Sequence, residues 1–210
     1  MSAGRAVPVK DLILVPSLIT LAITVLRLVG ELQNWSPSLF GKAAGGGGSL
    51  VGISWLIVVF GFYFGWRLTR EGHPADSPGK LVGLSLLAVL VVGFAAFAAG
   101  KISQNAFFGV FILGSIAALA LTARLWPALW KTLLAYAFAA RIPVVIVMLF
   151  AILGNWGTHY DVPPPNFPAY SPIVKWVLIG VVPQLTLWIY MTVVGGLFFG
   201  GLAGLMARRR

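Results

Sequence analysis

The chain of 210 residues has no cysteine and few charged residues, which make up only 10% of it. Without cysteine there can be no disulfide, no thiol chemistry, no cysteine-ligated metal and no lipid-modified cysteine. Soluble domains carry about 25% charged residues, so water is not the main solvent of this chain. Hydrophobic residues make up 59% of the sequence, which is typical of a protein that crosses a membrane several times.

Acidic residues are rarer still, and all five lie outside the centres of the apolar runs: Asp11, Glu31, Glu71, Asp76 and Asp161. Cation-coupled pumps and transporters rely on buried carboxylates, so this distribution counts against coupling to protons or sodium. The two histidines lie in loops expected on opposite sides of the membrane, which argues against a haem held by paired histidines. No GxSxG or HExxH motif is present. We therefore expect no cofactor and no metal site, and we favour a non-enzymatic protein.

Six apolar segments are long enough to cross a hydrocarbon core about 30 Å thick. They predict an all-α fold, an integral membrane bundle of about six transmembrane helices with short loops, in which residues 1–210 form a single domain. The first segment has no small-residue cleavage site and is predicted to be an uncleaved helix. The last segment exceeds the membrane thickness, so it must tilt, break or run past the bilayer, with Pro183 and Gly195-Gly196 as the expected bends. The segments are residues 12–30, 50–68, 81–99, 106–123, 128–153 and 173–207.

Lysine and arginine are unevenly shared between alternate loops. Ten fall on the side of the two termini and three on the other, while Arg27 and Arg141 lie inside predicted helices. Because cytoplasmic loops carry the excess of basic residues, both termini are predicted to be cytoplasmic, in a bacterial inner membrane. The basic residues do not form an aromatic-interleaved face, so we expect no nucleic-acid partner.

Arg141 lies near the predicted midplane, because ten helical residues, about 15 Å, separate it from Lys131 at the inner boundary. Gln184, in the last segment, is expected at a similar depth. Pro143 and Pro183 each leave a helix carbonyl without its usual donor. Arg141 either ties this layer together as a hydrogen-bond network or binds an anion, such as a lipid phosphate or a ligand carboxylate.

The first segment carries a polar stripe, and we favour an interhelical packing role for it over a water-accessible pathway. Arg27 and Glu31 at its outer end are spaced for an ion pair. The stripe consists of Ser17, Thr20, Thr24, Arg27 and Glu31, all on one helical face.

Glycines at four-residue spacing predict close helix packing, by default within the chain rather than between subunits. They are Gly61 and Gly65, together with Gly196, Gly200 and Gly204. The run AAGGGGS at residues 43–49 predicts a flexible hinge or a place where backbone packs closely.

The loop of residues 154–172 combines His159 and Asp161 with five prolines and several aromatic residues. These two side chains could form a proton-transfer pair or begin a metal site, but two ligands are too few for structural zinc. We favour a rigid extended strap along the membrane surface.

These features leave three functional hypotheses. The leading one is an accessory or structural membrane subunit that binds anionic lipid or another membrane protein through Arg141, with the bilayer as its general partner. The first alternative is a small uncoupled transporter or channel for an anionic or neutral solute, whose pathway would be the face of Ser17, Thr20, Thr24 and Arg27 together with Arg141. The second is a membrane enzyme that acts on lipid at the outer face through His159 and Asp161.

Overall fold

The computed structural model describes residues 9–46 and 49–208. The chain is 74% helical, and the described residues contain no strand, so the predicted all-α fold is confirmed. Four long helices begin and end within a few residues of their predicted limits: α1 (Val9–Leu32), α3 (Pro78–Gly100), α4 (Gln104–Thr122) and α5 (Pro127–Gly154). Three of the ten basic residues counted on the side of the termini, Arg5, Arg209 and Arg210, lie outside the described residues, as do Gly47 and Gly48 of the glycine run.

Local sequence signals account for these helix ends. Proline is the first residue of both α3 and α5, where its missing N–H is not needed by the helix. Ser103 precedes α4, and its hydroxyl accepts a hydrogen bond from the backbone N–H of Ala106 at 3.1 Å. Asn155 ends α5 in the left-handed conformation, with φ of 48°.

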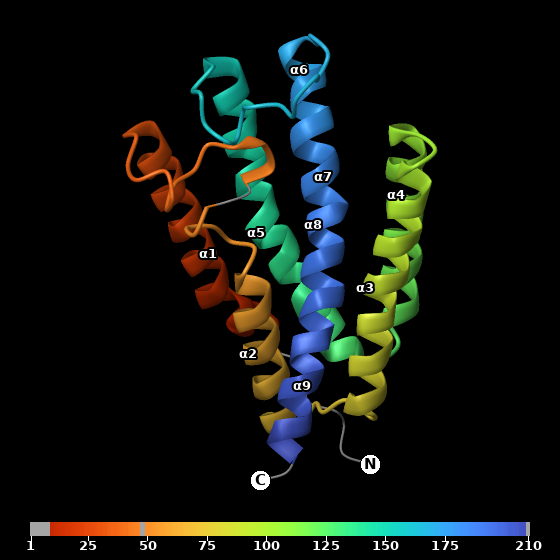
Figure 1. Ribbon diagram of the computed structural model, residues 1–210. Coiled ribbons are helices and arrows are strands. Elements are labelled where there is room, and N and C mark those ends of the chain that lie inside the picture. The colour runs from red at the N-terminus through yellow and green to blue at the C-terminus, as the bar shows by residue number, and fades with distance from the viewer. Residues whose placement is uncertain (1–8, 47–48, 209–210) are drawn as a thin grey trace.

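The prediction of a long helix over residues 50–68 is wrong in its first third. The helix α2 runs only from Leu56 to Arg70, and at about 22 Å it is too short to cross the hydrocarbon core. Within the described ranges, five helices, rather than about six, are long and apolar enough to span a membrane. Since α1 and α3 run in the same direction, the chain returns between them through α2 and the irregular residues ahead of it (Figure 1).

The segment before α2, residues 33–55, is called the glycine loop here. It contains one short 3₁₀ turn, η1 (Ala44–Gly46), and descends beside α1 and α5 before α2 begins (Figure 1). Glycine at Gly45 and Gly46 permits φ of 70° and 74°, values that are costly for other residues. Because positive φ angles do not occur in a right-handed helix, Gly45 and Gly46 prevent a continuous helix through this part of the chain.

The last segment is one helical run from Pro172 to Ala207, without a break. It passes through α6 (Pro172–Lys175), the π-helical η2 (Trp176–Val181), α7 (Val182–Leu185) and α8 (Leu187–Tyr190), then the π-helical η3 (Met191–Gly195) and α9 (Gly196–Arg208). The first π turn ends two residues before Pro183 and the second ends at Gly195, close to the two expected bends. Each adds a residue to a turn, which accommodates a proline or glycine without ending the helix.

The last helical run forms the axis of the molecule (Figure 1). On one side α2 packs along α9, and α5 lies against the middle of the run with α1 behind it; on the other side stands the α3–α4 hairpin. The largest buried cluster lies where α1, α2, α5 and α9 converge, with Phe64, Leu129 and Leu197 fully buried.

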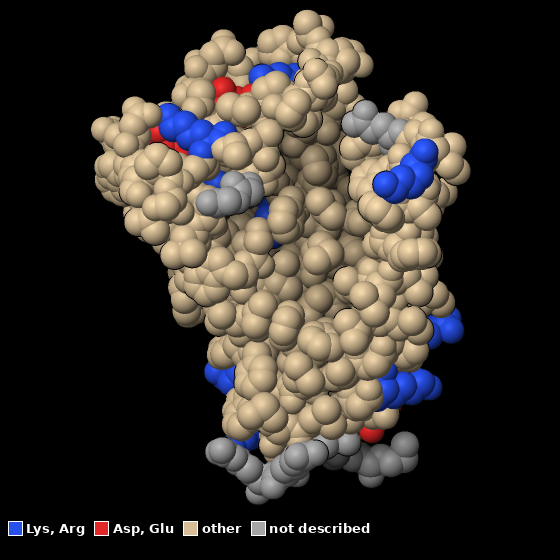
Figure 2. Space-filling view, in the orientation of Figure 1, with Lys and Arg blue, Asp and Glu red and all other residues tan. Residues whose placement is uncertain are grey.

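Basic side chains lie mostly toward the two ends of the bundle, and few charged atoms show on the visible face between them (Figure 2). One end, called the basic end here, carries Arg67, Arg70, Lys80, Arg124 and Lys131 at the ends of α2 to α5. The opposite end carries the glycine loop and the loop of residues 155–171, called the proline loop. Figure 2 also shows a hollow between the α3–α4 hairpin and the rest of the bundle near this opposite end.

Candidate functional site: two buried arginines

The polar stripe of α1 faces inward against α5. Thr20 donates its hydroxyl to the carbonyl of Pro16 at 2.8 Å and lies 2.8 Å from the hydroxyl of Tyr136, a residue of α5. Thr24 donates to the carbonyl of Thr20 at 2.9 Å, and both threonines are buried. Ser17 is half-buried, and its hydroxyl has no partner among the described residues. The hydroxyls of Thr20 and Thr24 are thus satisfied by their own helix and its neighbour, as in helix packing.

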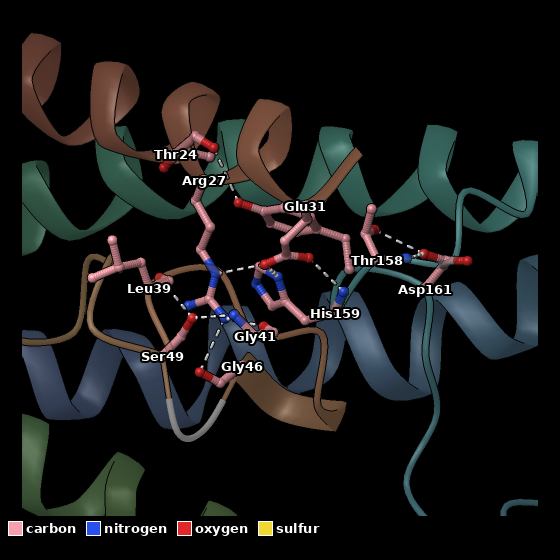
Figure 3. A network of polar contacts seen from close by, with 11 residues as sticks. Thr24, Arg27, Glu31, Leu39, Gly41, Gly46, Ser49, Thr158, His159 and Asp161 are labelled. Atoms are coloured by element: carbon pink, nitrogen blue, oxygen red, sulfur yellow. Dashed lines mark hydrogen bonds and ion pairs between the residues drawn. The ribbon is translucent and has the colours of Figure 1, made fainter. Parts of the chain in front are cut away.

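At the outer end of the stripe, Arg27, Glu31 and His159 form the Arg27–Glu31–His159 cluster (Figure 3). Arg27 Nε donates to Glu31 Oε1 at 2.8 Å. The same oxygen lies 2.5 Å from His159 Nδ1, while Glu31 Oε2 accepts the backbone N–H of His159 at 2.8 Å. Glu31 is fully buried, at 0% exposure, so this carboxylate joins α1 to the proline loop inside the protein.

Arg27 also fixes the glycine loop. Its Nη2 donates to the carbonyl oxygens of Gly41 and Gly46, each at 3.1 Å (Figure 3). A methyl group added at Gly52 would lie 3.0 Å from Nη1 of Arg27, and one at Gly46 would lie 3.3 Å from both terminal nitrogens. Glycine at these two positions leaves room for the guanidinium. At Gly46 the run of residues 43–49 is thus a place of close backbone packing.

Asp161 is occupied within the proline loop. Its Oδ2 accepts the backbone N–H of Gly157 at 2.9 Å, and its Oδ1 accepts the backbone N–H and the hydroxyl of Thr158 at 2.7 and 2.8 Å. His159 therefore bonds to Glu31, whereas Asp161 caps a turn. The structure places these two predicted site residues near each other but assigns them different partners.

The same loop is anchored further by Tyr160, which donates its hydroxyl to the carbonyl of Thr24 at 3.2 Å. Burial raises the pKa of Tyr160, so its hydroxyl stays protonated as a donor. Burial lowers the pKa of His159, and the nearby Arg27 acts in the same direction, outweighing the attraction of Glu31. His159 is therefore neutral at pH 7 and donates Nδ1–H to the carboxylate.

The second buried arginine, Arg141, is satisfied far less well. It is 3% exposed, on the side of α5 that faces the last helical run. Its Nη1 donates to Gln184 Oε1 at 3.4 Å, a long hydrogen bond. Its guanidinium carbon lies 4.6 Å from the centre of the Trp188 ring, within the range of a cation–π interaction. Its Nε has no hydrogen-bond partner within the described part of the chain.

No acid of the described chain forms an ion pair with Arg141. The ion pairs among residues 9–46 and 49–208 are Arg27–Glu31 and Arg67–Glu71, and Glu31 also accepts a hydrogen bond from the neutral ring of His159. Asp161 is held by its own turn. A guanidinium near the middle of a membrane-spanning helix thus lacks a counter-charge from these residues.

The glycine motifs meet in one interface. A methyl group added at Gly61 would lie 2.9 Å from the Cα of Gly196, and one at Gly65 would lie 2.5 Å from the Cα of Gly200. Gly204, one turn further, has only side chains of Thr69 and Trp126 nearby, at 3.6 Å. These glycines therefore pack α2 against α9 within the chain, and their close backbone contact holds the short helix α2 in place.

Several residues of these sites carry no sequence signal of their own. Gly41 contributes only a carbonyl oxygen, and Tyr136 and Trp188 resemble any other aromatic residue of an apolar helix. The i, i+4 spacing of Arg27 and Glu31 did indicate their pairing. The only signal for His159 is that the chain has just two histidines as candidate partners of a carboxylate.

Within the described residues, no group of three or more His, Cys, Asp or Glu side chains lies close enough to hold a metal ion. Comparisons with protein-family models, with curated proteins and with solved structures found no match to this chain. The chain has the helices of a multi-pass membrane protein.

Proposed function

We propose that the chain is a non-enzymatic, accessory membrane subunit that binds the anionic group of a lipid or of another membrane protein at Arg141. The observation that supports this most directly is the buried, incompletely bonded guanidinium described above. Ionisable side chains inside a membrane are costly and are functional in most cases where they occur. A phosphate or carboxylate would provide both the missing charge and an acceptor for Nε.

The contacts of the other candidate residues support structural roles. The hydroxyls of Thr20 and Thr24 are bonded to helix carbonyls, which leaves them less suited to line a solute pathway. His159 and Asp161, the pair that an enzyme would use, are engaged with Glu31 and with the loop backbone. These contacts favour a binding subunit over the transporter and the enzyme.

Native mass spectrometry of the protein in a mild detergent tests the proposal, comparing wild type with Arg141→Leu. The matched control is Lys101→Gln, which removes one positive charge at an exposed turn. We expect wild type and Lys101→Gln to carry an added mass that Arg141→Leu has lost. A mass of a phospholipid identifies a lipid phosphate as the anion, and a mass of a polypeptide identifies a partner. Bare protein in all three samples would contradict the proposal.

We further propose that the basic end faces the cytoplasm of a bacterial inner membrane, because basic loops are retained on that side. The absence of cysteine allows single cysteines to report on orientation. In intact spheroplasts, an impermeant thiol reagent should label Lys101→Cys and leave Arg124→Cys unlabelled until the membrane is opened. The reverse pattern would invert the assignment.

A further inference from the structure

The α3–α4 hairpin carries a groove that none of the contacts above uses. It is apolar, with a volume of about 360 Å³, and its walls include Leu84, Leu87 and Val91 of α3 with Ala117 and Leu121 of α4. Leu87, Val91 and Leu121 are more than half exposed, so the groove opens to the surroundings of the helices. It follows α3 for about 12 Å, from Leu84 to Val92.

Two basic side chains lie at one mouth of the groove. Lys80 precedes Leu84 by about one helical turn, and Arg124 follows Thr122, a lining residue, by two positions. Both side chains are exposed, and neither belongs to an ion pair among the described residues. Figure 2 shows lysine and arginine side chains at this lower end of the hairpin. They lie at helix ends, where a bilayer has its headgroups.

We propose that this groove is a binding site for an anionic phospholipid of the leaflet at the basic end. One acyl chain would lie between α3 and α4, and its phosphate would bind Lys80 and Arg124. Along the membrane normal, the apolar groove lies at the level of the acyl chains and the basic mouth lies at the level of the headgroups. Basic side chains next to a membrane span are the usual ligands of anionic headgroups.

A protein helix fits this groove less well than a lipid does. A helix about 10 Å wide and 12 Å long displaces roughly 900 Å³, against the 360 Å³ available. A second copy of the chain would meet the groove across a twofold axis along the membrane normal. That arrangement would bring Lys80 and Arg124 of both copies to the same level, where like charges repel. Charge complementarity therefore favours the lipid.

The test is a titration of the full-length protein, in mild detergent, with phosphatidylglycerol or with phosphatidylcholine of the same acyl chains, followed by native mass spectrometry. We expect wild type to bind phosphatidylglycerol more tightly than phosphatidylcholine. The double variant Lys80→Gln/Arg124→Gln should weaken that binding about tenfold or more, since each basic side chain contributes about fivefold. The matched control Arg70→Gln/Lys131→Gln removes two charges at the same end but away from the groove, and it should change binding less than twofold.

A second variant tests the acyl-chain seat. Ala117→Phe fills the groove from an exposed position on α4, so it should weaken the binding of both lipids while the melting temperature stays near that of wild type. Equal binding of the two lipids by wild type, or equal losses in the two double variants, would overturn the proposal. A dimer that disappears in Ala117→Phe would overturn it in favour of a second copy of the chain. Because Arg141 is intact in every variant, any lipid that binds at Arg141 contributes equally to all of them. The difference in binding between the two double variants therefore reports on the groove, whether or not the proposed function holds.

Discussion

The chain contains two Arg–Glu pairs at the same helical spacing, which allows a direct measurement of what burial does to an ion pair. Arg27–Glu31 joins its atoms at 2.8 Å, with side-chain exposures of 9% and 0%. Arg67–Glu71 joins them at 2.5 Å, with exposures of 48% and 28%. Glu31→Gln and Glu71→Gln remove the same charge from each pair without a large change in shape.

The expected costs differ several-fold. Breaking a buried ion pair costs about 3–5 kcal/mol, because the partner charge stays buried without compensation. Glu31 also accepts two hydrogen bonds from His159, which places Glu31→Gln within that range. An exposed pair contributes about 0.2–1 kcal/mol, so Glu71→Gln should stay below about 1 kcal/mol.

Reversible unfolding in mixed micelles would give both free energies of unfolding, and hydrogen exchange at the backbone amide of His159 would localise the effect. That amide donates to Glu31, so its exchange should accelerate in Glu31→Gln and stay unchanged in Glu71→Gln. Equal destabilisation by the two variants would refute the argument from burial. A destabilised Glu31→Gln with unchanged exchange at His159 would refute the role of Glu31 in holding the proline loop.

Two further predictions concern packing and pH. Gly65→Ala should destabilise the protein by about 1–3 kcal/mol, because the added methyl would lie 2.5 Å from the Cα of Gly200. Gly93→Ala, with nothing within 4 Å of the new methyl, should be neutral or stabilising by up to about 1 kcal/mol; equal melting temperatures of the two variants would contradict this. Because burial lowers the pKa of His159 from its ordinary 6.5, the unfolded chain binds more protons below that pH, and stability should fall as the pH drops from 6.5. His159→Asn should flatten the profile of melting temperature between pH 8 and 5, and a profile as steep as that of wild type would exclude His159 as the source.

Most of the fold could be predicted because the long helices carry their own signals. Length and apolar composition identify α3, α4 and α5, while Pro78, Ser103 and Pro127 mark where they begin. The error at α2 has a physical cause that local sequence does not contain. Residues 50–55 are as apolar as a helix requires, but Gly52 lies beside a guanidinium from α1, and that contact forms only after the chain has folded.

The charged residues of the candidate site could be predicted from the sequence, but the hydrogen bonds between distant segments could not. Spacing along one helix places Arg27 and Glu31 on the same face, and depth along two helices brings Arg141 to Gln184. The bond between Glu31 and His159 joins residues 128 positions apart, and no periodicity links them. Proximity in sequence instead paired His159 with Asp161, which the structure shows as a turn cap.

The two buried arginines differ in how completely the chain satisfies them, and that difference is the main argument for a ligand. Around Arg27 the chain provides a carboxylate and two carbonyl oxygens, and it keeps glycine at two positions so that the guanidinium fits. Around Arg141 the described chain provides one long hydrogen bond and one aromatic face. Arg141 lies deeper along its helix than Arg27, so its charge is the more costly of the two. The chain thus neutralises the guanidinium of Arg27 but provides no carboxylate for the deeper guanidinium of Arg141 among the described residues. This is the arrangement expected if an anion from outside the chain binds Arg141.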